Sequence, residues 1–361
     1  MPRSKPSISS KKILVVVLNW GLGHAARSTP LIQRLLEAGH QVVLASDGRA
    51  GLLLRQEFPS LDYEELPGYN IRYGSSNMIL NIAWQWPKII AAAFKEHTKV
   101  KILAKKHQID LIISDSRFGC FHPTIKSIFI THQLWIKTPY PLLSFVTNKL
   151  NHWLIKQFNE CWIPDGTNEQ SIAGKLSQPI TNVLYRYLGH LSRMQYKDLP
   201  PKYPLIALLS GPEPQRTRFE KLILEQAQSM KITMLIIQGK TEGGQEFRKV
   251  GNITIIPSLS GSALNETLLS GELILCRAGY SSIMDLFVLQ KPAILIPTPG
   301  QTEQEHLAER LMKKGWYYSQ KQNNFSLEHA LEVAREYKGF VTKNESLNGE
   351  LLDAAIAAIE A

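Results

Sequence analysis

Cysteine is scarce in this sequence, which has only Cys120, Cys161 and Cys276 among its 361 residues. Three widely separated cysteines cannot build a disulfide framework, and their spacings match no pattern of zinc ligands. Each of them lies in or beside an apolar stretch. We therefore predict three reduced, buried thiols in a cytoplasmic protein.

Long hydrophobic runs are missing as well, since no apolar stretch approaches the roughly 18 residues that cross a membrane. Residues 1–12 are basic like the start of a signal peptide, but the apolar run after them ends at Leu18 and meets Asn19-Trp20-Gly21. The sequence also has no tandem repeat and no low-complexity tract. These absences predict a soluble, intracellular protein.

Acidic residues are outnumbered in the first half of the chain. Residues 1–189 hold 22 lysines and arginines against 12 acidic residues, whereas residues 190–361 hold 19 of each, so the net charge of +10 belongs to the first half. A basic half is typical of proteins that meet nucleic acid, an anionic membrane or an acidic substrate. Because zinc-finger spacings, aromatic ribonucleoprotein motifs and basic regions with heptads are all missing, we expect no nucleic-acid partner.

What the sequence does contain is a regular alternation of strands and helices. Apolar runs of strand length recur in both halves, and segments of helical periodicity follow them. The expected strands are residues 12–18, 41–46, 110–114, 128–131, 161–164, 182–188, 205–209, 232–238, 253–257, 273–276 and 293–297. This alternation predicts an α/β fold with two doubly wound, Rossmann-like domains that face each other across a cleft.

Glycine and proline interrupt the alternation near residues 189–204. We therefore expect a first domain over residues 12–189 and a second over residues 190–340. Residues 341–361 are rich in alanine and are expected to form a final helix that packs back toward the first domain. Ligands of doubly wound sheets bind at the carboxyl ends of the strands, so the chemistry should lie in the loops that follow them.

The first such loop is Asn19–Arg27. Gly21 and Gly23 allow the backbone to approach a ligand closely, and His24 titrates near neutral pH and can take a proton from a hydroxyl. The alternative is a histidine that only packs or caps the helix. The third glycine of a dinucleotide fingerprint is missing, which disfavours a nicotinamide oxidoreductase.

A second loop, Arg277–Asp285, follows the strand at 273–276. Gly279 permits a turn, and Ser281 and Ser282 open a helix whose amino end suits a diphosphate. Asp285 lies one turn further on, where a carboxylate can accept both hydroxyls of a ribose. An ordinary helix start, with Ser281 as its cap, is the alternative.

Two further loops occupy equivalent positions. Residues 297–306 combine amides and carboxylates that could bind sugar hydroxyls, and Ser210-Gly211-Pro212 places a glycine where a phosphate would fit. A well-capped helix start and an ordinary turn are the alternative explanations of these two segments.

Taken together, four segments resemble glycosyltransferases of the GT-B fold and of family 28: Asn19–Arg27, Arg277–Asp285, Lys291–Pro297 and Glu303–Ala308. The resemblance is to the enzymes that add N-acetylglucosamine to the undecaprenyl-linked muramoyl-pentapeptide precursor of peptidoglycan. It implies a UDP-sugar donor in the second domain and an acceptor in the first. Trp20, Leu22 and Pro212 stand where that family has small residues, and Glu303 stands where it has an amide.

The resemblance also implies roles for single residues. Asp285 would hold the ribose, and Gly279, Tyr280, Ser281 and Ser282 would lie under the diphosphate, with Arg193, Ser210 and Gly211 touching the phosphates. Glu303 and Gln304 would contact the donor sugar, and the backbone around Ser258 and Leu259 would meet the uracil. Gly21, Gly23, His24 and the pair His132-Gln133 would face the acceptor.

The mechanism that follows is an inverting transfer. An acceptor hydroxyl attacks the anomeric carbon while UDP leaves from the opposite face, and His24 or a carboxylate such as Asp115 takes the proton. Arg193, Arg277 and the helix end at Ser281 would meet the charge that grows on the phosphates. No Asp-x-Asp pair stands out as a metal ligand, so neither a cofactor nor an obligatory metal is expected.

Two segments of the first domain combine lysines with tryptophans, residues 71–106 and 134–158. The first holds Arg72, Lys88, Lys95, Lys99, Lys101, Lys105 and Lys106 against Glu96 alone, interleaved with Tyr73, Trp84, Trp86, Ile89, Ile90 and Phe94. Such a composition is typical of a helix at an anionic membrane surface, where the enzyme would be peripheral at the inner face. A core-facing helix with a solvated basic face is the alternative. A lipid-linked glycan, a glycolipid or another anionic acceptor would fit.

Two other functions remain open at this point. A nucleotide-sugar epimerase or hydrolase would use the same fold and donor site without an acceptor. A non-catalytic nucleotide-sugar-binding protein would function without His24, because binding needs no base.

Overall fold

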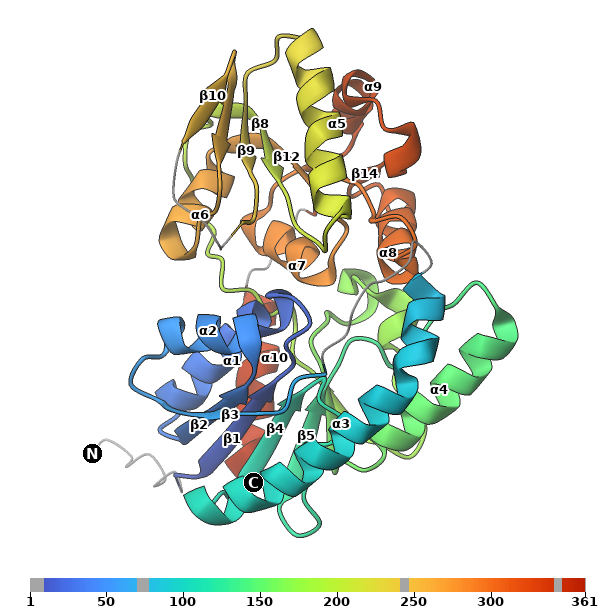
Figure 1. Cartoon of the computed structure of the whole chain (residues 1–361). Coiled ribbons are helices and arrows are strands. Elements are labelled where there is room, and N and C mark those ends of the chain that lie inside the picture. Colours follow the sequence, from blue (N-terminus) through green and yellow to red (C-terminus); the bar gives the residue numbers. More distant parts are fainter. Residues whose placement is uncertain (1–9, 70–77, 241–246, 341–345, 361) are drawn as a thin grey trace, which may run out of the picture. The chain divides into compact units, whose positions relative to one another are not determined.

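The computed structural model describes residues 10–69, 78–240, 247–340 and 346–360. The chain divides into two compact units, the first made of residues up to 72, 80–191 and 344–361, and the second mainly of residues 192–343. Each unit is built on a seven-stranded sheet with helices on both faces (Figure 1). The expected α/β class with two doubly wound, Rossmann-like sheets is therefore confirmed.

The first unit has the strand order β3-β2-β1-β4-β5-β6-β7, and all of its strand pairs are parallel. Its strands are β1 (Lys12–Val17), β2 (Gln41–Ser46), β3 (Asp62–Glu65), β4 (Leu111–Asp115), β5 (Lys126–Ile130), β6 (Glu160–Ile163) and β7 (Leu184–Tyr187). Its helices are α1 (Gly23–Glu37), α2 (Gly48–Glu57), α3 (Met78–His107), α4 (Pro141–Ile155) and α10 (Ser346–Glu360). The chain order reverses between β1 and β4, which makes their carboxyl ends the place where a ligand is expected.

Strand β1 shows why both faces of this sheet are covered. Ile13, Val15 and Val17 point to one face and pack with α1, α2 and α10, whereas Leu14 and Val16 point to the other face and pack with α3. All five side chains are at most 1% exposed. Alternation of buried side chains on both faces is what a continuous apolar run predicts for a central parallel strand.

The second unit repeats the arrangement, with the strand order β10-β11-β9-β8-β12-β13-β14. Its strands are β8 (Tyr203–Leu208), β9 (Met234–Ile237), β10 (Arg248–Val250), β11 (Ile253–Ile256), β12 (Gly271–Cys276), β13 (Ala293–Leu295) and β14 (Tyr318–Ser319). Its helices are α5 (Gln215–Ser229), α6 (Gly261–Leu269), α7 (Tyr280–Leu289), α8 (Thr302–Lys313) and α9 (Leu327–Val333). Only β10 runs antiparallel to its neighbour among these described strands. The order reverses between β8 and β12.

The final helix α10 belongs to the core of the first unit. Leu352, Ala355, Ile356 and Ile359 are at most 5% exposed and join the cluster that includes β1 and α1. The amine of Lys11 donates a hydrogen bond to the carbonyl of Ile359, which ties the helix end to the chain segment before β1. The three cysteines are buried free thiols, as expected.

We predict that Ile356→Ala lowers the free energy of unfolding by about 2–4 kcal/mol, because it leaves a cavity under α10. Chemical denaturation followed by circular dichroism measures the change. Ala357→Ser, on the exposed side of the same helix, is the control and should stay within about 0.5 kcal/mol of the wild type. An equal effect of both variants would contradict the packing of α10 in this core.

Candidate functional site

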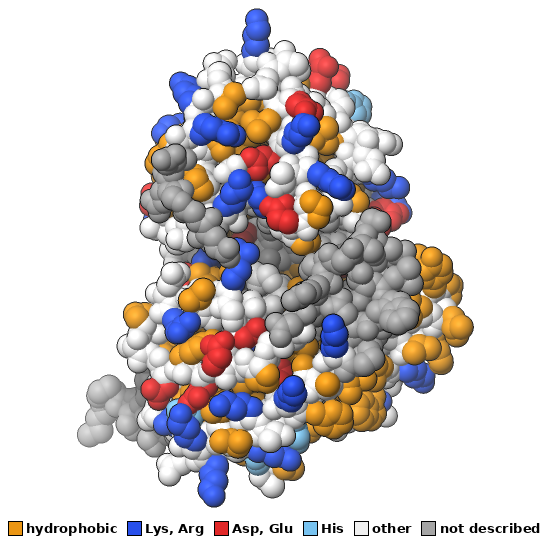
Figure 2. Space-filling model, viewed as in Figure 1, with side chains coloured by type: hydrophobic (Ala, Val, Ile, Leu, Met, Phe, Trp, Pro, Cys, Tyr) orange, Lys and Arg blue, Asp and Glu red, His pale blue; other side chains and the backbone are white. Residues whose placement is uncertain are grey.

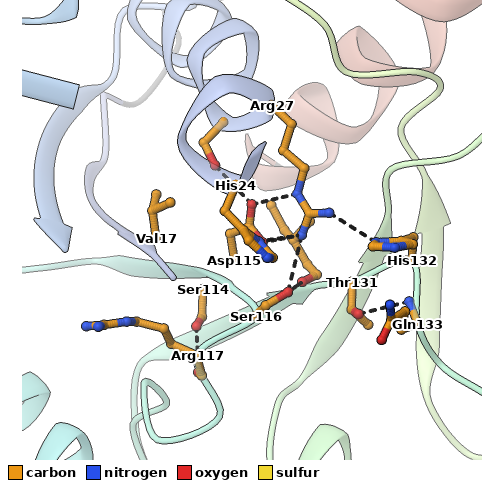
Figure 3. Close-up of polar contacts among 12 residues, drawn as sticks. Val17, His24, Arg27, Ser114, Asp115, Ser116, Arg117, Thr131, His132 and Gln133 are labelled. Atoms are coloured by element: carbon orange, nitrogen blue, oxygen red, sulfur yellow. Dashed lines mark hydrogen bonds and ion pairs between the residues drawn. The ribbon is translucent and has the colours of Figure 1, made fainter. Parts of the chain in front are cut away.

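The carboxyl ends of β1 and β4 carry a cluster of charged side chains. His24 lies in the first turn of α1 and Asp115 is the last residue of β4, and His24 Nδ1 lies 2.9 Å from Asp115 Oδ1 (Figure 3). Two of the predicted catalytic residues are thus in contact, although 91 positions separate them in the sequence. The topology explains the contact, because β1 and β4 are neighbours and Val17 pairs with Asp115.

Arg27 lies at the centre of this cluster. Its Nε donates to Asp115 Oδ2 at 2.8 Å, and its Nη2 donates to the other carboxylate oxygen. Its Nη1 lies 3.1 Å from His132 Nδ1, and its Nη2 lies 3.0 Å from His24 Nδ1. The side chains of Arg27 and Asp115 are both buried, so this ion pair is shielded from water.

The electrostatics of the cluster suit a base. Burial alone would raise the pKa of Asp115, but Arg27 and His24 hold it well below the ordinary value. Burial and the charge of Arg27 together lower the pKa of His24, against the opposing effect of Asp115. His24 is therefore neutral at pH 7, and the 18% of its side chain that stays exposed gives a substrate access to it.

The remaining predicted acceptor residues lie around this cluster. Gly21 has a φ of +78°, a conformation that favours glycine, and a Cβ added there would meet nothing within 4 Å. Gly23 is the first residue of α1. His132 and Gln133 follow β5, and the backbone N–H of Gln133 donates to Thr131 Oγ1 at 3.0 Å. The open space at Gly21 leaves room for a ligand against the backbone.

A second buried ion network supports the loop after β1. Arg117 is fully buried and pairs with Asp47 and with Glu96, whose Oε1 lies 3.4 Å from Arg117 Nε. Asn19 donates to Asp47 Oδ2 at 3.0 Å and accepts from the amide of Ala50 at 3.2 Å. The start of the loop Asn19–Arg27, which contains Gly21 and Gly23, is thereby held at the carboxyl end of β2.

In the second unit, the corresponding strand ends are those of β8 and β12. Helix α7 begins at Tyr280 with Gly279 as its cap residue, so Ser281 and Ser282 lie in its first turn and are partly exposed. Asp285 accepts a hydrogen bond of 2.5 Å from Ser192 Oγ. Burial raises the pKa of Asp285 to about 6. The carboxylate is therefore mostly ionised at pH 7 and protonated in mild acid.

Arg277 does not lie where the sequence analysis expects a phosphate ligand. Its side chain is 1% exposed and points into the unit, where it donates to the carbonyls of Ile296, Pro297 and Gln215 at 3.0–3.4 Å. Its guanidinium also lies 4.2 Å from the ring centre of Phe219. Arg277 therefore holds the loops after β13 and before α5, and the expectation of a direct phosphate contact is corrected.

The other predicted donor residues also belong to the second unit. Gly211, with φ at +102°, and Ser210 follow β8, and a Cβ at Gly211 would lie 3.8 Å from Thr298 Oγ1. Gln304 accepts from the amide of Thr298 at 2.9 Å, so it braces the loop before α8. Leu259 follows β11, Glu303 lies in the first turn of α8, and Arg193 precedes β8; all three are partly exposed.

Sequence reasoning missed three residues of these sites. Arg27 and Ser28 both bond to Asp115, the latter through a hydroxyl at 3.1 Å, and Ser192 bonds to Asp285. Arg27 had a usable signal, since it stands three residues after His24 and shares its helix face. Ser192 had none, because only the folded chain shows that it reaches α7.

Two features are absent from the part of the chain that the structure describes, a membrane-spanning helix and a metal-binding group. No described helix is both long and apolar enough to cross the bilayer. Nowhere in the described ranges do three or more histidine, cysteine or acidic side chains form a group that could hold a metal ion.

Comparisons with known proteins agree with this architecture. Residues 220–346 match the family described as glycosyltransferase family 28 C-terminal domain, and residues 11–131 match glycosyl transferase family 1. An uncharacterized glycosyltransferase of Methanosarcina mazei is 24% identical over 331 residues, which cover 84% of each chain. The UDP-N-acetylglucosamine–N-acetylmuramyl-(pentapeptide) pyrophosphoryl-undecaprenol N-acetylglucosamine transferase of Acetivibrio thermocellus is 28% identical over 127 residues, which cover 32% of this chain and 34% of the relative.

Among solved structures, Acinetobacter baumannii MurG matches with a TM-score of 0.57 and 13% identity, over 97% of this chain and 99% of its own. Arabidopsis thaliana UGT89C1, solved with UDP-L-rhamnose, matches with a TM-score of 0.64 and 14% identity, over 98% and 94%. At this level of identity the likeness shows the fold.

We predict that Arg277→Ala destabilises the second unit by about 3 kcal/mol, because it leaves buried carbonyls without donors. Arg218→Ala, on the exposed side of α5, is the matched control and should change little. Thermal unfolding of both variants measures the difference. If Arg277→Ala is as stable as the wild type but binds nucleotides weakly, the structural role is contradicted and Arg277 contacts the phosphate directly.

Proposed function

The chain is a glycosyltransferase of the GT-B fold, and we propose that it transfers a hexosyl or N-acetylhexosaminyl group from a UDP-sugar to an acceptor hydroxyl, with inversion of the anomeric carbon. The observation that carries this proposal is the neutral, partly exposed His24 backed by the buried carboxylate of Asp115. A base that is held by a carboxylate at a strand end is the arrangement that activates a hydroxyl nucleophile.

In this mechanism Asp115 orients the ring through Nδ1, and Nε2 of His24 takes the proton from the acceptor hydroxyl. The oxygen forms a bond to the anomeric carbon as the bond to the UDP oxygen breaks, so the sugar centre is inverted. Both oxygens of Asp115 accept hydrogen bonds from Arg27, which keeps the carboxylate ionised and unavailable as a base. Asp115 therefore acts as the group that orients His24. His24 is accordingly our candidate for the base.

The donor half of the proposal rests on the second unit. The amino end of α7 at Tyr280–Ser282, the turn at Ser210-Gly211 and Arg193 would hold the diphosphate. Asp285 would accept the ribose hydroxyls, Glu303 and Gln304 would contact the sugar, and the backbone near Leu259 would meet the uracil. Since these donors supply positive potential directly, we propose that the transfer needs no metal ion.

The acceptor half of the proposal includes an anionic membrane surface. On α4 the outward stripe Leu142, Phe145, Val146 and Trp153 is 54–77% exposed, and hydrophobic side chains gather over this region in Figure 2. Lys149 lies on the same stripe, with its amine 5.5 Å from the ring centre of Phe145. An apolar stripe with lysines and without acidic residues over 134–158 suits insertion among anionic headgroups.

The basic segment at residues 71–106 supports the same proposal, although part of it lies outside the described residues. Phe94 and Ile102 on α3 are 70% and 58% exposed, and Lys95 and Lys101 are exposed beside them. The side chains of Trp84, Trp86 and Ile89, and residues 71–77 with Arg72 and Tyr73, lie outside the described residues. We propose a cytoplasmic enzyme, peripheral at the inner face of a membrane, with a lipid-linked glycan or a glycolipid as the acceptor.

We predict that His24→Gln lowers the rate of transfer by about 10²–10⁴-fold, because a general base is lost. The assay measures UDP release from UDP-N-acetylglucosamine with an undecaprenyl-diphosphate-linked muramoyl-pentapeptide, and donor affinity is measured in parallel. His329→Gln, on the exposed face of α9, is the control. Undiminished transfer by His24→Gln would contradict the assignment, and equal UDP release without acceptor would favour a hydrolase.

Donor affinity should depend on pH through Asp285. Because ribose hydroxyls donate to an ionised carboxylate, a pKa near 6 predicts that affinity is lost as the pH falls, by about tenfold between pH 7 and 5. Calorimetry with UDP-N-acetylglucosamine measures this, since its doubly esterified diphosphate does not titrate in that range. Asp285→Asn should bind weakly at both pH values, and an unchanged pH profile in that variant would refute the role of Asp285.

Membrane binding should depend on the outward stripe of α4. We predict that Phe145→Ser with Trp153→Ser weakens binding to phosphatidylglycerol-containing vesicles at least tenfold, because two apolar anchors are lost (about 1.5–3 kcal/mol each when fully buried). Phe247→Ser removes a 71% exposed aromatic ring from the second unit and is the control. Sedimentation that leaves all three proteins equally bound, or none bound, would contradict the membrane surface.

A further inference from the structure

Arg27 has more polar contacts in the candidate catalytic cluster than a structural ion pair requires. Its side chain is 4% exposed, and it touches groups from three parts of the first unit. These are Asp115 at the end of β4, Ser116 after it at 3.2 Å, His24 on the preceding helical turn, and His132 after β5. One side chain thus connects all the ionisable groups of the cluster.

The arrangement of the N–H donors on the Arg27 guanidinium determines which neighbouring atoms accept hydrogen bonds. Nε and Nη2 bind the two oxygens of Asp115, a bidentate geometry that only arginine supplies. A guanidinium donates and never accepts, so His132 Nδ1 is the acceptor of Nη1 and the proton of His132 lies on Nε2. At His24 we assign the Nδ1 hydrogen to Asp115 Oδ1, so the 3.0 Å approach of Arg27 Nη2 to this nitrogen is a charge contact and not a hydrogen bond. Figure 3 shows the imidazole rings of His24 and His132 on opposite sides of the Arg27 guanidinium.

The Asp115 carboxylate is consequently shared among three partners. Oδ2 accepts from Arg27 Nε at 2.8 Å and from Ser28 Oγ at 3.1 Å, and Oδ1 faces both Arg27 and His24 Nδ1. A carboxylate that is already neutralised by a guanidinium orients an imidazole without strongly favouring its protonation. This differs from an isolated carboxylate–histidine pair, in which the full negative charge would raise the basicity of the ring.

From this geometry we propose that Arg27 is a positioning residue: its guanidinium holds the Asp115 carboxylate and both imidazole rings in one frame, so that His24 meets the acceptor hydroxyl with an unprotonated Nε2. The charged and titratable groups that face His24 are Arg27 on α1, Asp115 on β4 and His132 after β5. Arg27 and His132 oppose the protonation of His24, and Asp115 favours it. The relevance of this frame to sugar transfer rests on the proposed function, whereas its effect on His24 does not.

The test is a direct titration of the histidine rings by nuclear magnetic resonance. The pKa of His24 is measured in the wild type, in Arg27→Gln and in Arg27→Lys, with His24→Gln to assign the signal. We expect a wild-type value below 6.5 and an increase of about one unit or more in Arg27→Gln, because a positive charge within about 4 Å is removed. Arg27→Lys keeps the charge without the fork and should stay closer to the wild type.

Arg34→Gln is the matched control, since Arg34 lies on the same helix but bonds to Glu37 near the surface. This variant should leave the His24 pKa unchanged. The nitrogen shifts of His132 should show the proton on Nε2 in the wild type and a mixture of tautomers in Arg27→Gln. An unchanged or lowered His24 pKa in Arg27→Gln, or a wild-type value at or above 6.5, would overturn the proposal.

Activity then separates this proposal from the proposed function. If both hold, the acid limb of kcat/KM moves to higher pH in Arg27→Gln by the same amount as the pKa of His24. If the pKa moves while His24→Gln transfers sugar as fast as the wild type, the role of Arg27 stands and the catalytic role of His24 fails. A purely structural role would lower activity at every pH without moving the acid limb.

Discussion

The buried ion pair between Arg27 and Asp115 is the interaction on which the first unit's site depends. A charge at the end of a central strand is costly to bury, and it is tolerated here because both carboxylate oxygens are bonded. The pair joins α1, the helix that follows β1, to the end of β4, and the strand order reverses between β1 and β4. Its removal would therefore alter the position of the helix start and the ionisation of His24 together.

The second unit has the same kind of sheet with different side chains at its strand ends. Its strand order reverses between β8 and β12, and the loops there present glycine, serine hydroxyls and a helix start instead of a buried ion pair. Arg277 stabilises the neighbouring loop after β13 by donating to two of its carbonyls. In the proposed mechanism the first unit would take the proton of the acceptor and the second would bind the phosphates and hydroxyls of the donor, which are the two requirements of transfer from a nucleotide sugar.

Much of the fold could be predicted from the sequence, because central parallel strands are continuous apolar runs. Residues 41–46 form β2 as expected, and β1 and β12 differ from expectation only at their ends. The edge strand β3 was missed, since Asp62-Tyr63-Glu64-Glu65 has no apolar run, and β14 is only two residues long. Periodicity reports burial, and edge strands are only partly buried. Hydrophobic periodicity does not predict the contacts of single side chains. Arg277 was expected to bind phosphate, because its position in a loop after a strand does not reveal that its side chain points into the unit.

The account as a whole depends on the identity of the donor, which a thermal-shift measurement tests most directly. The purified protein would be melted with UDP, UDP-N-acetylglucosamine, UDP-glucose, UDP-galactose, GDP-mannose, dTDP-glucose and NAD. A ligand at about 100 times its dissociation constant adds about 2.7 kcal/mol of stability, which raises the melting temperature by several degrees. The account predicts stabilisation by the uridine nucleotides. Stabilisation by NAD alone, or no response to any uridine nucleotide, would contradict it.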